Sequence, residues 1–576
     1  MNVLMANVSN DDFAFKVLTH KIVINKDFQK MFVCDNIEKF SDKMFHNLYT
    51  KEEVKRLYTN ICNDNKNQKL LWFNDDLTFS KKTLELYRAI ENSYFHGLVP
   101  SNYHNEKIFG FINKIINNEF QPKELSYAIN RLDLLLSDAY ITLAQNMLFG
   151  FSNWYKFKNI VIDEKEKFEW IRRESSANVD VLYYLIEQYQ DGDIFTAIED
   201  LAPPYSDYDR LKEALQEYRN IKALGGWKTD IVYKEKLRVK KSNYQISKVK
   251  HRLIATGDLS SDITNIDSSY FDKILEIAVK RFQQRHNLKI DGIIGSQTIK
   301  SLNVSVSQKI EKIILNLDRY RWLPKDIDDS YIDINIPSYH LNVIENDQII
   351  ETQRVIVGKK KRPTPILNSK ISTLVLNPYW TAPKTIIQKD FLRGLKKNPV
   401  EYAKGHDLRI YDRSLSKSKA RELNVSNINW SRHTKKTILK YRFVQPPSNR
   451  NPLGNVKFLF ANPFSVYMHD TSSRSLFKKD NRHFSSGCVR IQNPNWMIKY
   501  LIEKEGAKKY SKIEKKLKRG KNYKVRLTSE VPVIVRYMTS HVDRDSLVYF
   551  YEDIYSYDEI QRKAISQVED DGNLSE

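Results

Sequence analysis

The chain has 576 residues, which is too long for a single hydrophobic core and implies several domains. Hydrophobic residues make up 41% of the sequence and aromatic residues 12%, so packed globular cores are expected and a mainly disordered chain is excluded. The formal net charge of +22 favours acidic partners. The excess is mostly Lys and is spread along the chain, so a general compositional bias explains it equally well. No nucleic-acid partner is expected, because no recognition motif accompanies the charge.

Three cysteines occur, Cys34, Cys62 and Cys488, so a disulfide framework is excluded. A single bridge between Cys34 and Cys62 and two unpaired core cysteines are equally compatible with the sequence. No stretch approaches the roughly 20 apolar residues of a transmembrane helix, and no transmembrane segment is expected. The first residues, 1–32, also lack the basic start and apolar run of a secretory signal.

Residues 1–77 are left unassigned, and residues 78–235 are predicted to form a helical scaffold domain. Long amphipathic patterns run from Leu125 to Gly150 and from Tyr208 to Lys222, with a break at Pro203-Pro204 before the second of them. This block therefore reads as all-helical.

Residues 245–305 form the next unit, a small three-helix bundle. Asp291-Gly292 is a turn signal, and Ser296 is expected as the N-cap of a short helix that ends at Leu302. The sequence alone leaves a structural spacer as the plain interpretation of this unit.

Residues 328–560 are predicted to be mainly β, because apolar residues alternate from Tyr331 onward and a hairpin is expected across Glu345–Asp347. A polar, Lys-rich insertion with helical character interrupts this pattern at 386–444. Insertions of that size in a sheet domain are commonly lids or substrate loops. The acidic tail, 566–576, is expected to be disordered. The predicted fold class is thus a multidomain α+β protein, with a helical scaffold, a three-helix bundle and a mainly β domain that carries a helical lid insertion.

A candidate catalytic motif lies between Tyr467 and Arg490, where His469 precedes Cys488 by nineteen residues. A lone Cys is more often a packing residue, but Gly487 permits backbone angles that turn successive amides toward one point and form an oxyanion hole. His469 ends a strand-like run, and a neighbouring imidazole lowers a thiol pKa toward neutrality. Arg490 shares a face with Cys488 in extended backbone and is placed to clamp a substrate carboxylate.

A metal site is the competing interpretation, because His469, Asp470, His483 and Cys488 are all potential zinc ligands. Their spacing matches no standard zinc pattern, so no metal is expected.

The motif Ser485-Ser486-Gly487-Cys488-Val489-Arg490 after His469 resembles the L,D-transpeptidase (YkuD-type) catalytic domain. Residues 96–104 and 132–140 resemble the scaffold of its large multidomain branch, and 281–295 resembles a peptidoglycan-binding-type module. The resemblance covers roughly residues 78–558. Many family members carry His in place of Ser486, and Ser448 stands where Gly is expected.

The resemblance implies Cys488 as nucleophile, His469 as base and then acid, and the amides around Gly487 and Cys488 as the oxyanion hole. It also implies that the main-chain carbonyl of Asp470, not its carboxylate, orients the imidazole. Residues implied in substrate positioning are Arg490, Tyr467 and Ser486.

The implied reaction joins peptidoglycan stem peptides, a tetrapeptide donor and an amine acceptor, through a thioacyl intermediate and without a cofactor. A carbapenem-sensitive enzyme of the bacterial periplasm or cell envelope, active in wall organisation and cell shape, is therefore expected, alongside other wall-synthesis proteins as partners. An L,D-carboxypeptidase or endopeptidase, and a non-catalytic wall-binding protein, remain alternatives.

Overall fold

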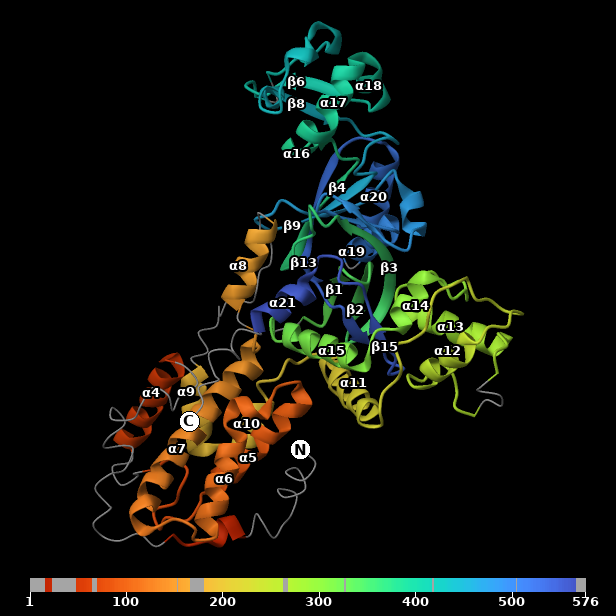
Figure 1. The fold of residues 1–576 in the computed structure, drawn as a ribbon. Coiled ribbons are helices and arrows are strands. Elements are labelled where there is room, and N and C mark those ends of the chain that lie inside the picture. The colour runs from red at the N-terminus through yellow and green to blue at the C-terminus, as the bar shows by residue number, and fades with distance from the viewer. Residues whose placement is uncertain are drawn as a thin grey trace.

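The computed structural model describes residues 16–22, 48–64, 70–152, 154–165, 181–262, 268–325, 328–416, 419–503 and 505–565. The chain is a multidomain α+β protein with a helical N-terminal part and a sheet-rich C-terminal part, as the sequence predicts (Figure 1). The expectations for Cys34, the Cys62 side chain and the acidic tail fall outside the described residues. No helix in the described ranges is long and apolar enough to cross a membrane.

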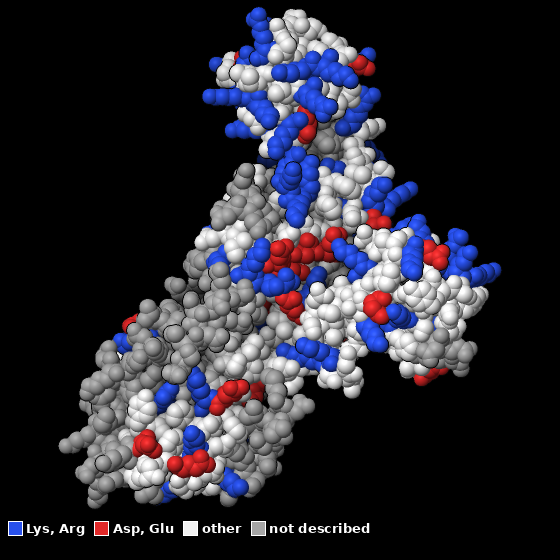
Figure 2. Space-filling view, viewed as in Figure 1, with Lys and Arg blue, Asp and Glu red and all other residues white. Residues whose placement is uncertain are grey.

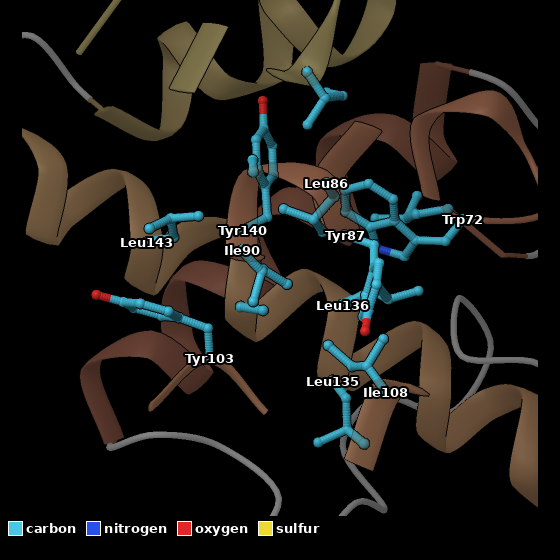
Figure 3. Packing of buried hydrophobic residues seen from close by; sticks show 14 of the residues in the cluster. Trp72, Leu86, Tyr87, Ile90, Tyr103, Ile108, Leu135, Leu136, Tyr140 and Leu143 are labelled. Carbon is cyan, nitrogen blue, oxygen red and sulfur yellow. The ribbon is translucent and has the colours of Figure 1, made fainter. Parts of the chain in front are cut away.

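The N-terminal helical domain is built around the long helix α7, which contains most of the predicted amphipathic stretch. The helices of this domain are α4 (Leu48–Asp64), α5 (Lys81–Asn92), α6 (Asn105–Ile116), α7 itself (Pro122–Phe149), α9 (Val181–Asp191) and α10 (Ile194–Glu199). Trp72 meets the rings of Tyr140 and Tyr189 edge to face at centroid distances of 5.6 and 5.8 Å (Figure 3). The phenol of Tyr58 on α4 donates to Asp133 on α7, so the packed helical core begins upstream of residue 78.

Two helices of the predicted scaffold region pack against the C-terminal domain instead. On α8 (Trp154–Lys165), Phe157 is fully buried against Trp322 and Tyr557, with ring centroids 5.6 and 6.1 Å apart. The second helix, α11 (Ser206–Ala223), packs on α15 (Val306–Tyr320) and shares its apolar cluster. The helical block therefore contacts the C-terminal part of the chain at two places, through α8 and through α11.

The small bundle consists of three helices, as predicted: α12 (Gln245–Ile254), α13 (Lys273–Arg285) and α14 (Ser296–Leu302). The predicted N-cap at Ser296 is wrong by one residue. Gly295 has extended backbone angles and is the N-cap, whereas Ser296 is already the first helical residue. The bundle lies beside the C-terminal domain and is anchored by Arg285, which donates to the carbonyl of Val548 at 2.9 Å.

A nine-stranded mixed sheet forms the centre of the C-terminal domain, with strand order β11-β3-β12-β10-β9-β4-β13-β1-β2. Its strands are β1 (Ser330–Asn335), β2 (His340–Glu345), β3 (Gln348–Gly358), β4 (Leu367–Leu376), β9 (Val456–Phe460), β10 (Met468–His469), β11 (His483–Ser485), β12 (Val489–Ile491) and β13 (Tyr523–Arg536). The predicted hairpin joins β2 and β3, and both turn residues, Asn346 and Asp347, have positive φ. The strand-like run predicted to end at His469 is short, because Ser465 has φ +58 and pairing starts only at Met468.

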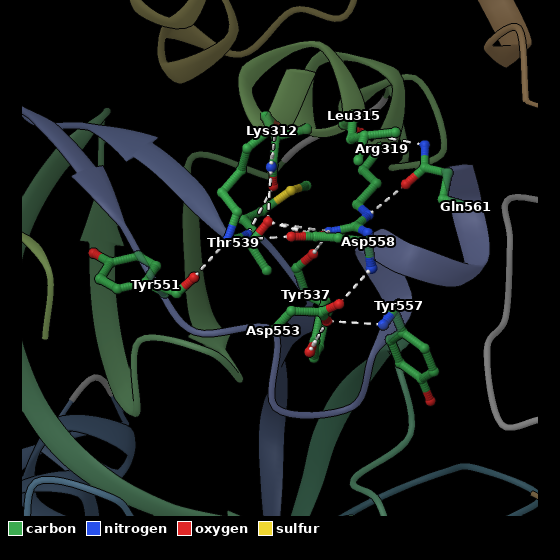
Figure 4. Close-up of polar contacts among 12 residues, drawn as sticks. Lys312, Leu315, Arg319, Tyr537, Thr539, Tyr551, Asp553, Tyr557, Asp558 and Gln561 are labelled. Carbon is green, nitrogen blue, oxygen red and sulfur yellow. Dashed lines mark hydrogen bonds and ion pairs between the residues drawn. The ribbon is translucent and has the colours of Figure 1, made fainter. Parts of the chain in front are cut away.

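Helices α19 (Pro494–Glu503), α20 (Ala507–Lys518) and α21 (Tyr557–Ile565) pack on this domain, and β14 (Ser540–Val542) pairs with β15 (Val548–Phe550) at its edge. A buried polar cluster joins α15 to α21 (Figure 4). Arg319 donates to Gln561 at 2.9 Å and pairs with Asp558 at 2.7 Å, and Asp558 also accepts from Thr539 at 2.9 Å. Pairing and hydrogen bonding together hold these buried charges in place.

The insertion forms a separate small unit with its own apolar core (Figure 1). This unit extends beyond the predicted bounds of 386–444, because it also includes β5 (Trp380–Thr381) and the start of α16 (Lys384–Ile386). Its other elements are a π-helical turn η6 (Ile387–Phe391), α17 (Leu392–Lys397), α18 (Pro399–Gly405), β6 (Arg409–Asp412), β7 (Glu422–Leu423) and β8 (Tyr441–Gln445). Beside the expected helices, this unit has a four-stranded sheet of order β5-β8-β6-β7, which the sequence pattern did not predict. Lys and Arg dominate its visible face (Figure 2).

Candidate active site

The pairing of β10 with β12 brings the predicted catalytic residues together. These strands are parallel, with Met468 opposite Val489 and His469 opposite Arg490. Because side chains alternate between faces, His469 and Arg490 share one face, while Met468 and Val489 are buried on the other. Tyr467 directly precedes Met468, and Cys488 directly precedes Val489, so by the same alternation both lie on the face of His469 and Arg490. The ring of Tyr467 lies 5.7 Å from that of His469.

The loop before Cys488 is held by side-chain hydrogen bonds. Gly487 has φ +117, a conformation that favours glycine, and its carbonyl accepts from Thr364 at 2.8 Å. Ser485 bridges the loop, because its hydroxyl donates to the carbonyl of Cys488 at 2.6 Å and accepts from the N–H of Gly487 at 3.1 Å. The Gly487 amide of the predicted oxyanion hole is therefore engaged by Ser485, which leaves the Cys488 amide as the candidate donor there.

The pKa of Cys488 was expected to be lowered, but in the structure it is raised. Burial raises the pKa of this thiol, and the backbone of Tyr467 and the cations of Arg490 and Lys457 offset only part of that rise. Cys488 is half-buried and free. The sequence interpretation failed here because burial depends on the whole fold and is not encoded in the local motif.

His469 is 5% exposed, and its imidazole is held by main-chain oxygen. Its Nδ1 lies 2.5 Å from the carbonyl of Asp470, so Nδ1 carries the proton and Nε2 is left as the basic nitrogen. Burial, together with the cations of Arg490 and Lys457, lowers the pKa of His469 to about 3. The imidazole is consequently neutral at neutral pH.

The carboxylate of Asp470 bonds to groups other than His469 and links the surrounding loops. It accepts from the N–H of Thr471 at 2.7 Å, from Arg474 at 2.6 Å and from the N–H of Asn455 at 2.8 Å. Gly454 makes room for it, because a Cβ at that position would lie 2.3 Å from the Asp470 carboxylate. The main-chain oxygen and the carboxylate of Asp470 thus have separate partners.

The three predicted substrate-positioning residues lie around Cys488. Arg490 and Tyr467 share its face of the sheet, and the Nε of Arg490 is buried without a hydrogen-bond partner among the described residues. Ser486 is exposed, and its hydroxyl accepts from Arg362 at 2.9 Å. The roles proposed for these three residues stay predictions.

Sequence reasoning missed two cations and a hydroxyl near the motif. Lys457 stands opposite His469 across the β9–β10 pairing, with its ammonium 5.3 Å from the centroid of the Tyr467 ring. Arg362 and Thr364 come from the Pro-rich loop after β3. No local signal in the sequence singles out either side chain.

Three of the four residues proposed for a competing zinc site, His469, Asp470 and His483, have other partners. His483 lies 2.8 Å from the hydroxyl of Tyr339, and Nδ1 of His469 faces a carbonyl. Within the described ranges, no group of three or more His, Cys, Asp and Glu side chains is arranged to hold a metal ion.

Comparisons with protein families agree with this arrangement. The L,D-transpeptidase catalytic domain profile matches residues 329–514, the range that contains the whole His469–Arg490 motif. The C-terminal domain is thus similar to the L,D-transpeptidase catalytic domain over those residues. A scaffold domain profile matches residues 53–215, and a profile described as a "putative peptidoglycan binding domain" matches residues 242–302. The scaffold match begins within α4, consistent with its packing on α7.

A curated relative from Haemophilus influenzae, named "Putative L,D-transpeptidase", is 33% identical over 267 residues, or 46% of this chain and 52% of the relative. The chain thus spans about half the length of the curated relative it matches. Among solved structures, an L,D-transpeptidase from Mycobacterium smegmatis is 13% identical, covering 36% of this chain and 58% of its own, with a TM-score of 0.18. An L,D-transpeptidase from Xylanimonas cellulosilytica is 14% identical, covering 53% of this chain and 99% of its own, also with a TM-score of 0.18.

Proposed function

We propose that this protein is an L,D-transpeptidase that forms 3-to-3 cross-links between peptidoglycan stem peptides, with Cys488 as the nucleophile. The observation that supports the proposal best is the strand register that puts Tyr467, His469, Cys488 and Arg490 on one face. The match of residues 242–302 to a peptidoglycan-binding profile supports the choice of substrate.

In the first step, the sulfur of Cys488 attacks the carbonyl of the third, diamino-acid residue of a donor tetrapeptide. The carbon–sulfur bond forms as Nε2 of His469 takes the thiol proton, and the amide of Cys488 stabilises the oxyanion. The carbon–nitrogen bond then breaks, and His469 returns the proton to the amine of the departing D-alanine. In the second step, an amine of a neighbouring stem attacks the thioester, forms the new amide and restores the thiol.

The neutral His469 suits this sequence of events. Because its pKa is lowered to about 3, its Nε2 carries no proton in the neutral range, and the same shift makes the imidazole a weaker base than a free histidine. The Cys488 pKa is raised, so thiol deprotonation accompanies attack and does not precede it. Arg490 and Lys457 supply the positive charge that a transient thiolate and an anionic substrate both require.

Water competes with the amine for the thioester, and the outcome separates a transpeptidase from a carboxypeptidase or endopeptidase. We assign the insertion, 386–444, the role of a lid that limits access of water. Its cationic visible face fits a carboxylate-rich wall polymer (Figure 2). Such a substrate places the protein outside the cytoplasmic membrane, in the periplasm or cell envelope, among other wall-synthesis proteins.

The test incubates the purified protein with a stem tetrapeptide, with and without an added amine acceptor, and reads the products by mass spectrometry. The proposal expects cross-linked dimer and loss of one D-alanine per link, and none of either with Cys488→Ala. Trimmed tripeptide without dimer would show hydrolysis instead. Product that still forms with Cys488→Ala would overturn the thioacyl mechanism, whereas a folded wild type that forms no product would favour a non-catalytic, wall-binding role.

An independent readout is the intact mass of the protein after exposure to a carbapenem. A covalent adduct on wild type that is missing from Cys488→Ala is expected, because the ring opens on the same sulfur. A folded wild type that acquires no adduct would contradict the proposed nucleophile.

A further inference from the structure

The basic loop that follows β3, residues 359–362, lies directly against the nucleophile loop. Its sequence is Lys359-Lys360-Lys361-Arg362, and the N–H of Lys359 donates to the carbonyl of Ser485 at 3.1 Å. The side chain of Arg362 reaches the same loop and donates to the hydroxyl of Ser486 at 2.9 Å. Four consecutive basic residues are thus carried by a loop that contacts Ser485 and Ser486, just before Cys488.

The backbone of this loop is firmly held, so the position of Arg362 is defined by the fold. The N–H of Arg362 donates to the carbonyl of Lys359 at 2.7 Å and closes a tight turn. On the far side of the turn, the hydroxyl of Thr364 accepts from the N–H of Gly358 and donates to the carbonyl of Gly487, both at 2.8 Å. The N–H of Thr364 is itself bound by the phenol of Tyr555 at 3.1 Å.

The charge of the loop is not neutralised within the described residues. None of Lys359, Lys360, Lys361 and Arg362 has an Asp or Glu partner there, whereas Arg474 on the other side of the site is paired with Asp470. Lys360 donates to the hydroxyl of Ser556, which carries no charge. Arg362 retains guanidinium N–H groups beyond the one that contacts Ser486, in the planar arrangement that binds carboxylate through two hydrogen bonds.

We propose that Arg362, aligned by Ser486, binds the terminal carboxylate of the residue that leaves the donor peptide. This inference rests on the proposed function and adds a specificity-determining residue to it. Ser486 and Cys488 are two positions apart, a separation of at most about 7 Å between their Cα atoms. The terminal carboxylate of a leaving residue lies one residue beyond the attacked carbonyl, about 3.5 Å of chain, so Arg362 is within its reach.

This assignment gives the two arginines different tasks. Arg490 lies on the sheet face beside the buried His469, where the attacked residue must sit, and Arg362 lies at the exposed side of the nucleophile loop, where the leaving residue must exit. Recognition of a free terminal carboxylate makes the enzyme select donors that end one residue after the attacked carbonyl. Donors that are longer, or whose terminus is an amide, lack that group in the right place.

The experiment compares two donors that differ in one group, a stem tetrapeptide with a free terminal carboxylate and the same peptide with a terminal carboxamide. The ratio of their kcat/KM values is measured for wild type, Arg362→Gln, Arg362→Lys and Ser486→Ala. Lys361→Gln is the matched control, because it removes the same charge one residue earlier on the same loop. Intact-mass labelling of Cys488 by a carbapenem verifies that each variant keeps a competent site.

Wild type is expected to prefer the carboxylate donor by about tenfold to a hundredfold, the range for one charge-assisted hydrogen-bonded contact. Arg362→Gln should lose that preference through a higher KM for the carboxylate donor, with the carboxamide donor unaffected. Arg362→Lys should keep part of the preference for the carboxylate donor, and Ser486→Ala should weaken that preference. Lys361→Gln should leave the preference unchanged.

Three results would overturn the inference: equal use of both donors by wild type, an unchanged ratio in Arg362→Gln, or an equal loss on both donors that marks Arg362 as purely structural. Failure of the proposed function looks different, because wild type would then release no D-alanine or D-alaninamide in a Cys488-dependent way, and both proposals would fall together.

Discussion

Arg490 stands directly opposite His469 in the parallel pairing of β10 and β12, and its cation contributes to the lowered pKa of the imidazole. Burial is the larger cause of that shift. The pairing therefore keeps the proposed base neutral while it holds a positive charge beside the thiol.

Replacing Arg490 should change the acidic limb of the pH profile. Without the neighbouring cation an imidazolium is less unfavourable, so in Arg490→Gln the His469 pKa rises above about 3 and the fall in kcat/KM moves to higher pH. Burial persists, so the pKa should stay below its ordinary value. Lys508→Gln, which removes an exposed cation on α20, is the control. An acidic limb that coincides in both variants would exclude Arg490 as a modulator of His469.

The thiol of Cys488 should titrate above its ordinary range. Burial destabilises the thiolate, so its fraction keeps growing by about tenfold per pH unit until the raised pKa is reached. The alkylation rate by iodoacetamide, followed on the Cys488 peptide by mass spectrometry, should rise from pH 7 to 9 without levelling. The same peptide in denatured protein should level off earlier. A plateau near neutral pH would instead indicate a preformed thiolate–imidazolium pair.

Asp470→Asn should separate the main-chain role of this residue from a triad role. An Asp that holds a catalytic His through its carboxylate loses about 10⁴ in rate on conversion to Asn. Here the main-chain carbonyl contacts His469, while the carboxylate binds Arg474 and two backbone amides. We expect a loss of only about tenfold, together with lower stability, because one charged hydrogen-bond partner is lost. A loss of several thousandfold at unchanged stability would point to direct action of the carboxylate.

Much of the fold could be predicted locally, because its signals lie within a few residues. The hairpin turn at Asn346-Asp347 and helix α7 follow directly from turn chemistry and apolar periodicity. The small sheet in the insertion was missed because β5 and β7 have only two residues each and leave no alternating pattern. Likewise, nothing in the sequence of α8 shows that Phe157 packs on Trp322, 165 positions away.

The features of the candidate site also fall into those that the local sequence predicts and those that only the fold determines. The spacing of His469 and Cys488 and the glycine at 487 are visible in the sequence, and so is the shared face of Cys488 and Arg490. The raised thiol pKa and the contact between Arg362 and Ser486 arise from burial and from segments distant in sequence. A single sequence carries no signal for either.

Phe157→Ala should loosen the attachment of α8 to the C-terminal domain. The side chain is fully buried between Trp322 and Tyr557, so its removal leaves a cavity and should cost about 3 to 5 kcal/mol in the free energy of unfolding. Chemical denaturation followed by tryptophan fluorescence measures the change. Ile277→Ala is the control, because that side chain is 63% exposed on α13 and should cost under about 0.5 kcal/mol. Equal, small effects in both variants would mean that α8 is not a stable part of this core.

Gly454→Ala should damage the site more than the backbone conformation alone explains. Gly454 and Gly520 both have positive φ, +55 and +69, so Ala at either position carries a similar strain of about 1 to 2 kcal/mol. A Cβ at Gly454 would also collide with the Asp470 carboxylate at 2.3 Å, whereas nothing lies within 4 Å at Gly520. Asp470 must then move, and its main-chain oxygen moves away from His469. We expect Gly520→Ala to lose stability but keep its rate of tetrapeptide turnover, and Gly454→Ala to lose both. If the two variants keep the same turnover per folded molecule, the position of Asp470 is not what holds the imidazole for catalysis.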